Sequence, residues 1–141
     1  MKRILLIDDD PTVRGAFRKI LEREGYDVVT ASNGKAAMRS VRQKDPDIVI
    51  TDMLMPEQDG VETIMELRRD YPELKVVAIS GGGCISSDYY LEVALKLGVE
   101  TVLHKPLKRE KLLATVEKIL NKPSQHRKSP AVCGGRAFTI N

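Results

Sequence analysis

The chain has 141 residues, of which 42% are hydrophobic and 30% are charged, a length and composition suited to one globular domain with its own core. Its 23 Lys and Arg residues exceed its 20 Asp and Glu residues, but the segment from residue 121 onward holds four of the bases and none of the acids. The first 120 residues are therefore close to neutral and lack the basic surface that nucleic-acid binding requires. We expect no direct nucleic-acid partner.

The N-terminal apolar run covers only residues 4–7, which is too short for the core of a signal peptide or for a membrane span. The two cysteines, Cys84 and Cys133, lie far apart in the sequence and have no His or Cys at ligand spacing. Neither a zinc site nor a disulfide framework is indicated. We therefore expect a cytoplasmic protein with reduced thiols and no membrane partner.

Short runs rich in Ile, Leu and Val recur along the chain and predict five buried strands. The runs cover residues 4–7, 28–29, 48–50, 76–79 and 101–103. Segments with helical spacing alternate with these runs and predict five helices. The apolar stripe of the first helix consists of Val13, Ala16, Phe17, Ile20 and Leu21, and that of the last consists of Leu112, Val116, Ile119 and Leu120. Such a βα repeat folds as a parallel sheet with helices on both faces.

Turn and cap residues mark the ends of these elements. Pro11 suits a first helical turn, and Asp10 before it suits the N-cap position. Gly25 follows the first helix, and Gly98 closes the fourth. From residue 121 to residue 141 the sequence turns to Pro, Ser, Gly and basic residues without periodicity. We therefore assign one domain to residues 1–120 and a basic, disordered tail to residues 121–141.

Three consecutive acidic residues, Asp8, Asp9 and Asp10, follow the first strand directly. Carboxylates held this close repel one another, by roughly 1 kcal/mol per pair about 4 Å apart in water and more when partly buried. A hard divalent cation such as magnesium would offset that repulsion. The simpler alternative is a polar turn in which Asp10 caps the helix at Pro11, and the triplet alone leaves both interpretations open.

Polar residues follow the other central strands as well. In an open parallel sheet of order 2-1-3-4-5, ligands bind beyond the carboxyl ends of the strands, where the strand order reverses. These ends carry Asp8 and Asp9 after the first strand, Asp52 after the third, Ser80 after the fourth and Lys105 after the fifth. We expect acids, hydroxyl and ammonium to share one crevice.

These residues and their order resemble the receiver domain of two-component response regulators over residues 1–120. The resemblance lies in IDDD after the first strand, DIVITDMLMPEQDG around Asp52, VVAISG with Ser80, and HKP with Lys105. Each motif alone is weak, whereas all four in order are specific. The resemblance implies an α/β, flavodoxin-like (βα)5 fold, with a doubly wound parallel sheet of five strands in the order 2-1-3-4-5.

The resemblance also implies a role for each residue. Asp52 would accept a phosphoryl group from the phosphohistidine of a histidine kinase or from a small phosphodonor. Asp8, Asp9 and Asp52 would bind Mg²⁺ together with the backbone carbonyl of Leu54, with Asp8 acting mainly through metal-bound water. Lys105 would pair with Asp52 and later with the phosphoryl group. Ser80 would bind a phosphoryl oxygen after rotating inward, and Pro106 would follow a cis bond that aims Lys105 into the crevice.

The implied protein is a regulator and not an enzyme, although it assists its own phosphoryl transfer and dephosphorylation. Its implied partners are a histidine kinase or phosphotransfer protein and a downstream output protein, with a phosphorylation-dependent homodimer as a further possibility. The expected docking surface combines the fourth helix, fifth strand and fifth helix, with Tyr89 and Tyr90 as candidates there.

Two positions depart from the family pattern. Val102 stands three residues before Lys105, where the family often has an aromatic residue that turns inward, and Leu54 replaces a side chain that is polar in many relatives. Two other functions are the alternatives. A phosphohydrolase with an aspartate nucleophile would carry a second acid two residues after the nucleophile, where Leu54 stands, and a pseudo-receiver would bind a partner without phosphorylation.

Overall fold

Five strands form one parallel sheet in the computed structural model, which describes residues 1–53, 60–80, 92 and 95–121. The strand order is β2-β1-β3-β4-β5, as predicted. The strands are β1 (Arg3–Ile7), β2 (Asp27–Ala31), β3 (Ile48–Asp52), β4 (Lys75–Ser80) and β5 (Thr101–His104). Each contains the apolar run that predicted it, and neighbouring strands pair in parallel register.

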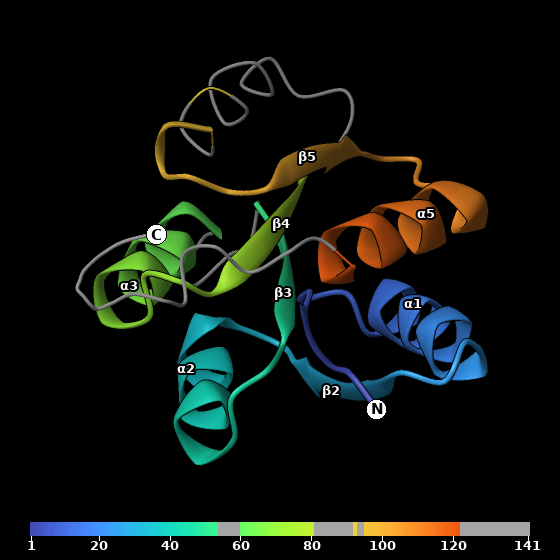
Figure 1. The fold of residues 1–141 in the computed structure, drawn as a ribbon, viewed down its shortest axis with the longest axis horizontal. Coiled ribbons are helices and arrows are strands. Elements are labelled where there is room, and N and C mark those ends of the chain that lie inside the picture. Colours follow the sequence, from blue (N-terminus) through green and yellow to red (C-terminus); the bar gives the residue numbers. More distant parts are fainter. Residues whose placement is uncertain (54–59, 81–91, 93–94, 122–141) are drawn as a thin grey trace.

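Helices cover both faces of the sheet. They are α1 (Pro11–Arg23), α2 (Gly34–Gln43), α3 (Gly60–Asp70) and α5 (Arg109–Leu120). Figure 1 shows α1 and α5 on one side of the sheet and α2 and α3 on the other. The doubly wound α/β fold is therefore confirmed. Most of the predicted fourth helix and the tail from residue 122 lie outside the described residues, as does the expected docking position at Tyr89 and Tyr90.

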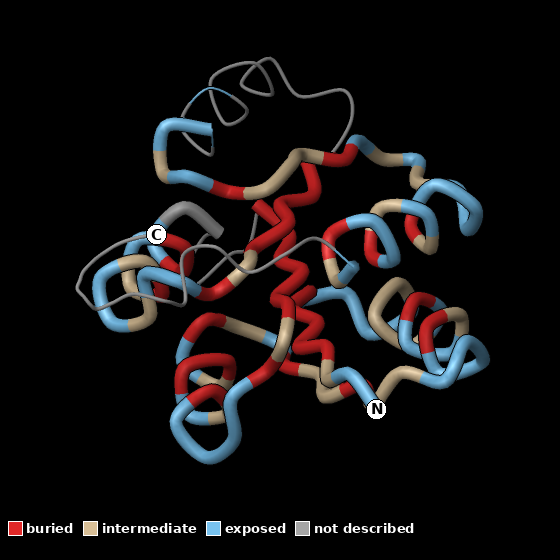
Figure 2. Tube along the Cα trace, in the orientation of Figure 1, coloured by how far each residue is buried: buried red, intermediate tan, exposed pale blue. Residues whose placement is uncertain are grey.

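Alternation along each strand divides the core into two apolar clusters, because successive side chains point to opposite faces. In β1, Ile4 and Leu6 pack in the cluster that contains Phe17 of α1 and Leu112 of α5. Leu5 and Ile7 pack instead in the cluster of α2 and α3. Figure 2 shows this burial as a continuous band along the central strands. The central strands β1, β3 and β4 are thus buried on both faces, which explains why their sequences are almost continuously apolar.

The predicted cap residues lie where they were expected. The Asp10 carboxylate accepts a hydrogen bond of 2.9 Å from the Thr12 N–H and so caps α1, whose first residue is Pro11. Gly25 and Gly98 have φ values of 93° and 83°, which favour glycine at these two turns. One detail of the predicted α1 stripe was wrong: Ala16 is exposed, because it lies at the edge of the stripe that the larger apolar side chains bury.

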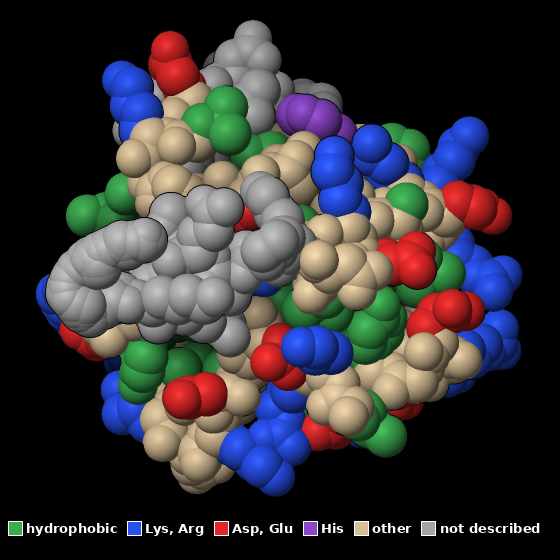
Figure 3. All heavy atoms as spheres, in the orientation of Figure 1, with side chains coloured by type: hydrophobic (Ala, Val, Ile, Leu, Met, Phe, Trp, Pro, Cys, Tyr) green, Lys and Arg blue, Asp and Glu red, His purple; other side chains and the backbone are tan. Residues whose placement is uncertain are grey.

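The surface carries charges of both signs. Figure 3 shows Lys and Arg side chains interspersed with Asp and Glu over one face of the molecule, which fits the near-neutral composition of the first 120 residues. The C-terminal end of α5 is tied to the sheet, because the Lys75 ammonium donates a hydrogen bond of 3.1 Å to the Ile119 carbonyl. Among the helices that the structure describes, none has the length and apolar character that a membrane span needs.

Candidate functional site

The register of the sheet brings the predicted site residues together at the carboxyl-terminal ends of the strands. Ile7 of β1 pairs with Thr51 of β3, so that Asp8 and Asp52, the next residue on each chain segment, extend side by side. At the same end of the sheet, Ser80 is the last residue of β4 and pairs with His104 of β5. Lys105 follows directly, and its backbone N–H donates a hydrogen bond of 2.9 Å to the Ser80 carbonyl. Asp8, Asp52, Ser80 and Lys105 therefore lie at or directly after the ends of four neighbouring strands, where the sequence predicted them.

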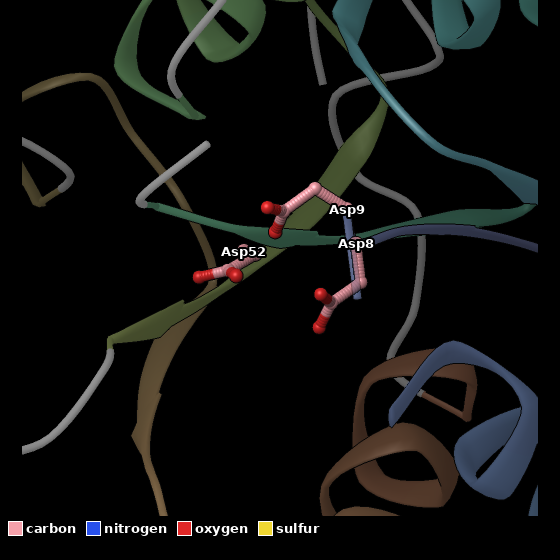
Figure 4. A group of neighbouring side chains, drawn as sticks. All are labelled: Asp8, Asp9 and Asp52. Atoms are coloured by element: carbon pink, nitrogen blue, oxygen red, sulfur yellow. The ribbon is translucent and has the colours of Figure 1, made fainter. Parts of the chain in front are cut away.

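Three carboxylates form the centre of the site. One oxygen from each of Asp8, Asp9 and Asp52 lies within 4.8 Å of the other two. Figure 4 shows Asp8 and Asp9 following β1, with Asp52 on the neighbouring β3. Asp8 and Asp52 are only 1% and 4% exposed, whereas Asp9 is exposed to solvent. Two buried carboxylates and one solvent-exposed carboxylate therefore lie close together where β1 and β3 end.

Asp8 is held in place from several directions. Its N–H continues the β1–β2 ladder by donating a hydrogen bond of 3.1 Å to the Ala31 carbonyl. Its Oδ1 accepts a 2.9 Å hydrogen bond from the Asp10 N–H. Its backbone carbonyl accepts a 2.7 Å hydrogen bond from Nη1 of Arg14. These hydrogen bonds satisfy the polar groups of the buried Asp8 and define its orientation.

One ammonium group lies between the two buried acids. Nζ of Lys105 lies 3.4 Å from an Asp52 oxygen and 3.6 Å from an Asp8 oxygen. Burial lowers the pKa of Lys105, but the attraction of Asp52 and Asp8, with their hydrogen bonds, outweighs burial, so that the pKa lies above its usual value of 10.5. The implied contact with Asp52 is therefore present, and Asp8 shares it. The predicted cis bond between Lys105 and Pro106 is also present.

The donor set suits a hard divalent cation. Among the described residues, this group combines three carboxylates with one ammonium, which pairs with two of them, so negative charge is in excess there. Carboxylate oxygens are the ligands that Mg²⁺ prefers, and this ion commonly uses one or two carboxylates while keeping bound waters. The residues present therefore fit a magnesium site, whereas nitrogen or sulfur donors for zinc do not occur in this group. The carbonyl of Leu54, the fourth expected ligand, lies outside the described residues.

The remaining expectations concern the switch. Ser80 is 2% exposed at the end of β4, beside the strand that carries Asp52. Val102, which occupies the aromatic position of the family, is half-buried and packs against the apolar cluster on the α2 and α3 side. The glycine-rich segment after Ser80, residues 81–83, lies outside the described residues.

Arg14 was not recognised from the sequence. It lies on α1, four residues after the N-cap, and its guanidinium reaches back to the strand-end loop. A cation one helical turn after an acid cluster was the available signal. That signal is ambiguous because Arg is also an ordinary residue on an exposed helix face.

Comparisons with known proteins identify the family to which the sequence is similar. A sequence model of the family described as "Response regulator receiver domain" matches residues 4–117. Response regulator MprA of Mycobacterium sp. strain KMS is 33% identical over 132 residues, which cover 92% of this chain and 56% of that protein. The alkaline phosphatase synthesis transcriptional regulatory protein PhoP of Bacillus subtilis strain 168 is 29% identical over 121 residues, which cover 86% of this chain and 49% of that protein. The chain thus spans about half the length of these curated relatives.

A solved structure has the same architecture. The crystal structure of a response regulator receiver domain protein from Clostridium thermocellum matches with a TM-score of 0.79 and 30% sequence identity. The match covers 86% of this chain and 95% of that one, so the similarity extends over nearly the whole of that crystallised chain.

Proposed function

The chain belongs to the response regulator receiver domain family of two-component signalling, and from that membership we propose that it is a phosphoacceptor switch in which Asp52 receives the phosphoryl group. One observation carries the choice of Asp52. Its carboxylate is buried at the end of β3, in contact with Lys105 and next to the acids that follow β1. Asp8 has the same neighbours, so the choice of Asp52 as the nucleophile rests also on its place in the family motif DIVITDMLMPEQDG.

The proposed transfer makes an acyl phosphate. A lone pair on an Asp52 oxygen attacks the phosphorus of a phosphohistidine or of a small phosphodonor. As the new O–P bond forms, the bond from phosphorus to the donor breaks and the donor keeps that electron pair; a leaving imidazole takes up a proton from solvent. Such reactions depend mainly on positioning and on neutralising the charge of the transferring group.

Asp8, Asp9, Asp52 and the Leu54 carbonyl hold the metal in this proposal, with Asp8 acting mainly through metal-bound water. When bound, Mg²⁺ supplies positive charge to the incoming phosphoryl oxygens. Lys105 supplies a second positive charge, which turns from the carboxylate of Asp52 to a phosphoryl oxygen after transfer. A fixed ammonium in a partly buried site stabilises such charge more strongly than water-exposed lysines do.

Ser80 couples the site to the rest of the molecule. Its hydroxyl donates a hydrogen bond to a phosphoryl oxygen after its side chain rotates toward Asp52. Its position at the end of β4, with its carbonyl bonded to the Lys105 N–H, supports this coupling. The rotation changes the contacts of the segment that follows Ser80, and a switch requires such differential contacts. Because Val102 stands in place of the aromatic residue, Ser80 carries the signal without the help of an aromatic side chain that turns inward.

The proposed partners are those of a signalling switch. A histidine kinase or phosphotransfer protein supplies the phosphoryl group, and a downstream output protein, or a second copy of the chain, binds the altered surface of the predicted fourth helix, β5 and α5. The protein assists its own phosphorylation and dephosphorylation but transforms no separate substrate. A cytoplasmic location, where such kinases display their phosphohistidine, forms part of the same proposal.

A small phosphodonor tests the proposed function directly. The wild type incubated with acetyl phosphate and Mg²⁺ should gain the mass of one phosphoryl group, measured on the intact protein. Asp52→Asn should gain none, because the nucleophile is lost, and excess chelator should suppress labelling of the wild type. Asp10→Asn, which changes a neighbouring acid but keeps a capping side chain, is the matched control and should label normally.

The same experiment separates the alternatives. A pseudo-receiver would remain unlabelled in every sample, and a phosphohydrolase would consume the donor through many turnovers without accumulating the phosphorylated form. Labelling of Asp52→Asn at the rate of the wild type, or labelling that persists in excess chelator, would refute the assignment of Asp52 or of the metal.

A further inference from the structure

Arg14 binds the peptide group that joins two of the three acidic residues. Its Nη1 donates a 2.7 Å hydrogen bond to the backbone carbonyl of Asp8, six residues earlier in the chain. That oxygen belongs to the peptide unit between Asp8 and Asp9. Because a peptide unit is planar, holding its oxygen also fixes the direction of the N–H of Asp9 and limits where the Cα of Asp9 can lie.

Asp9 is the acid that most needs this support. Asp8 is buried and has further partners at its N–H and its carboxylate, and Asp52 is buried within a strand. Asp9 is exposed, and among the described residues its carboxylate makes no hydrogen bond or ion pair. Its placement near Asp8 and Asp52 therefore depends on the backbone that carries it.

We propose that Arg14 is a positioning residue that orients Asp9 for metal binding through the Asp8 carbonyl. This inference rests on the proposed function, in which the three acids bind Mg²⁺. A hydrogen bond with a charged donor is stronger than one between neutral groups, so a guanidinium is well suited to fix a carbonyl. Groups that orient metal ligands in this way commonly affect metal affinity by about 10- to 100-fold.

Positioning and simple electrostatics predict opposite effects for the loss of Arg14. The guanidinium is a positive charge at the loop that carries the acids, so on charge alone its removal should strengthen the binding of a cation. Removing a group that orients Asp9 should weaken binding instead. The sign of the change in affinity therefore distinguishes the two roles.

The experiment measures Mg²⁺ affinity without phosphodonor, by isothermal titration calorimetry on the full chain. Arg14→Ala should bind Mg²⁺ about tenfold more weakly than the wild type, and Arg14→Lys, which keeps a charged donor, should recover part of the loss. Arg18→Ala is the matched control: it removes another cation from α1, one that pairs with Glu22 away from the site, and should bind like the wild type. Urea unfolding and far-UV circular dichroism spectra of the metal-free proteins establish that each variant is folded.

The proposal would be overturned if Arg14→Ala bound Mg²⁺ as tightly as the wild type or more tightly. It would also be overturned if Arg14→Ala and Arg18→Ala weakened Mg²⁺ binding equally, or if Arg14→Lys recovered none of the lost affinity. These results would leave the proposed function intact if the wild type still binds Mg²⁺ and is labelled at Asp52. A wild type that binds no Mg²⁺ would overturn both proposals. If Arg14→Ala is unfolded, the comparison of Arg14→Lys with the wild type decides, and equal affinities would then overturn the proposal.

Discussion

Lys105 shows how a single side chain makes the acidic site compatible with folding. Two largely buried carboxylates, those of Asp8 and Asp52, would repel each other and lose hydration without a compensating charge. Nζ of Lys105 lies within 3.6 Å of both. The lysine side chain is itself 27% exposed, so water screens part of this attraction. We therefore expect Lys105 to contribute to the stability of the metal-free protein.

Replacing Lys105 by Met should lower the free energy of unfolding of the metal-free protein by about 1–3 kcal/mol, because the buried acids lose their counter-charge. Since the pKa of Lys105 is raised, its contribution is complete below pH 10.5 and is lost as the pH rises through the higher folded-state pKa. The difference between Lys105→Met and the wild type should thus be constant near neutral pH and shrink in strong alkali. Urea unfolding at a series of pH values measures it.

The exposed residue Lys108 provides the control, because Lys108→Met removes a nearby lysine that makes no cap hydrogen bond for α5. It should change stability by less than about 0.5 kcal/mol. A stability difference for Lys105→Met that grows in alkali would contradict the raised pKa of Lys105.

The loop from β1 to α1 shows how one short segment serves both a site and a helix. Asp8 and Asp9 face the site, whereas Asp10 caps α1 through the Thr12 N–H. The Asp10 backbone N–H in turn binds the Asp8 carboxylate, so the helix start and the acidic site share a main-chain contact. Three adjacent acids therefore have separate roles because the chain turns sharply between a strand and a helix.

Asp10→Ala should lower the free energy of unfolding by about 1 kcal/mol, because the first turn of α1 loses its side-chain cap. Asp10→Asn should retain most of that stability. Both variants should bind Mg²⁺ much as the wild type does, since the contact to Asp8 uses the main chain. Urea unfolding and titration calorimetry test the two expectations separately, and a tenfold loss of Mg²⁺ affinity in Asp10→Asn would show that Asp10 is a ligand and not only a cap.

At the scale of the whole molecule, the parallel sheet brings distant segments of the chain together at the carboxyl-terminal ends of its strands. Asp8, Asp52 and Lys105 come from three segments of the sequence, and each follows or ends a strand whose apolar residues fill the two clusters of the core. Folding therefore forms the acidic site, and the unfolded chain has no equivalent. Any ligand of this site must stabilise the folded protein.

Mg²⁺ should raise the melting temperature of the wild type, with a stabilisation of about 2.7 kcal/mol when the free ion is present at 100 times its dissociation constant. Asp9→Asn should be more stable than the wild type without metal, because one repelling charge is gone, and should gain less from the ion. Thermal unfolding in chelator and in a Mg²⁺ series gives both values. A lower melting temperature of Asp9→Asn in chelator would contradict the repulsion argument.

The sequence by itself determined the strands, the parallel α/β class and the residues expected at the strand ends. It could do so because Ile and Val runs report local burial, and because Asp8, Asp52, Ser80 and Lys105 follow those runs directly. Only the tertiary structure decided that Lys105 also contacts Asp8, that Ala16 is exposed, and that Arg14 holds the Asp8 carbonyl. These facts depend on the register between strands and on how far a long side chain reaches back over a loop, and a local sequence pattern does not encode such distances between segments.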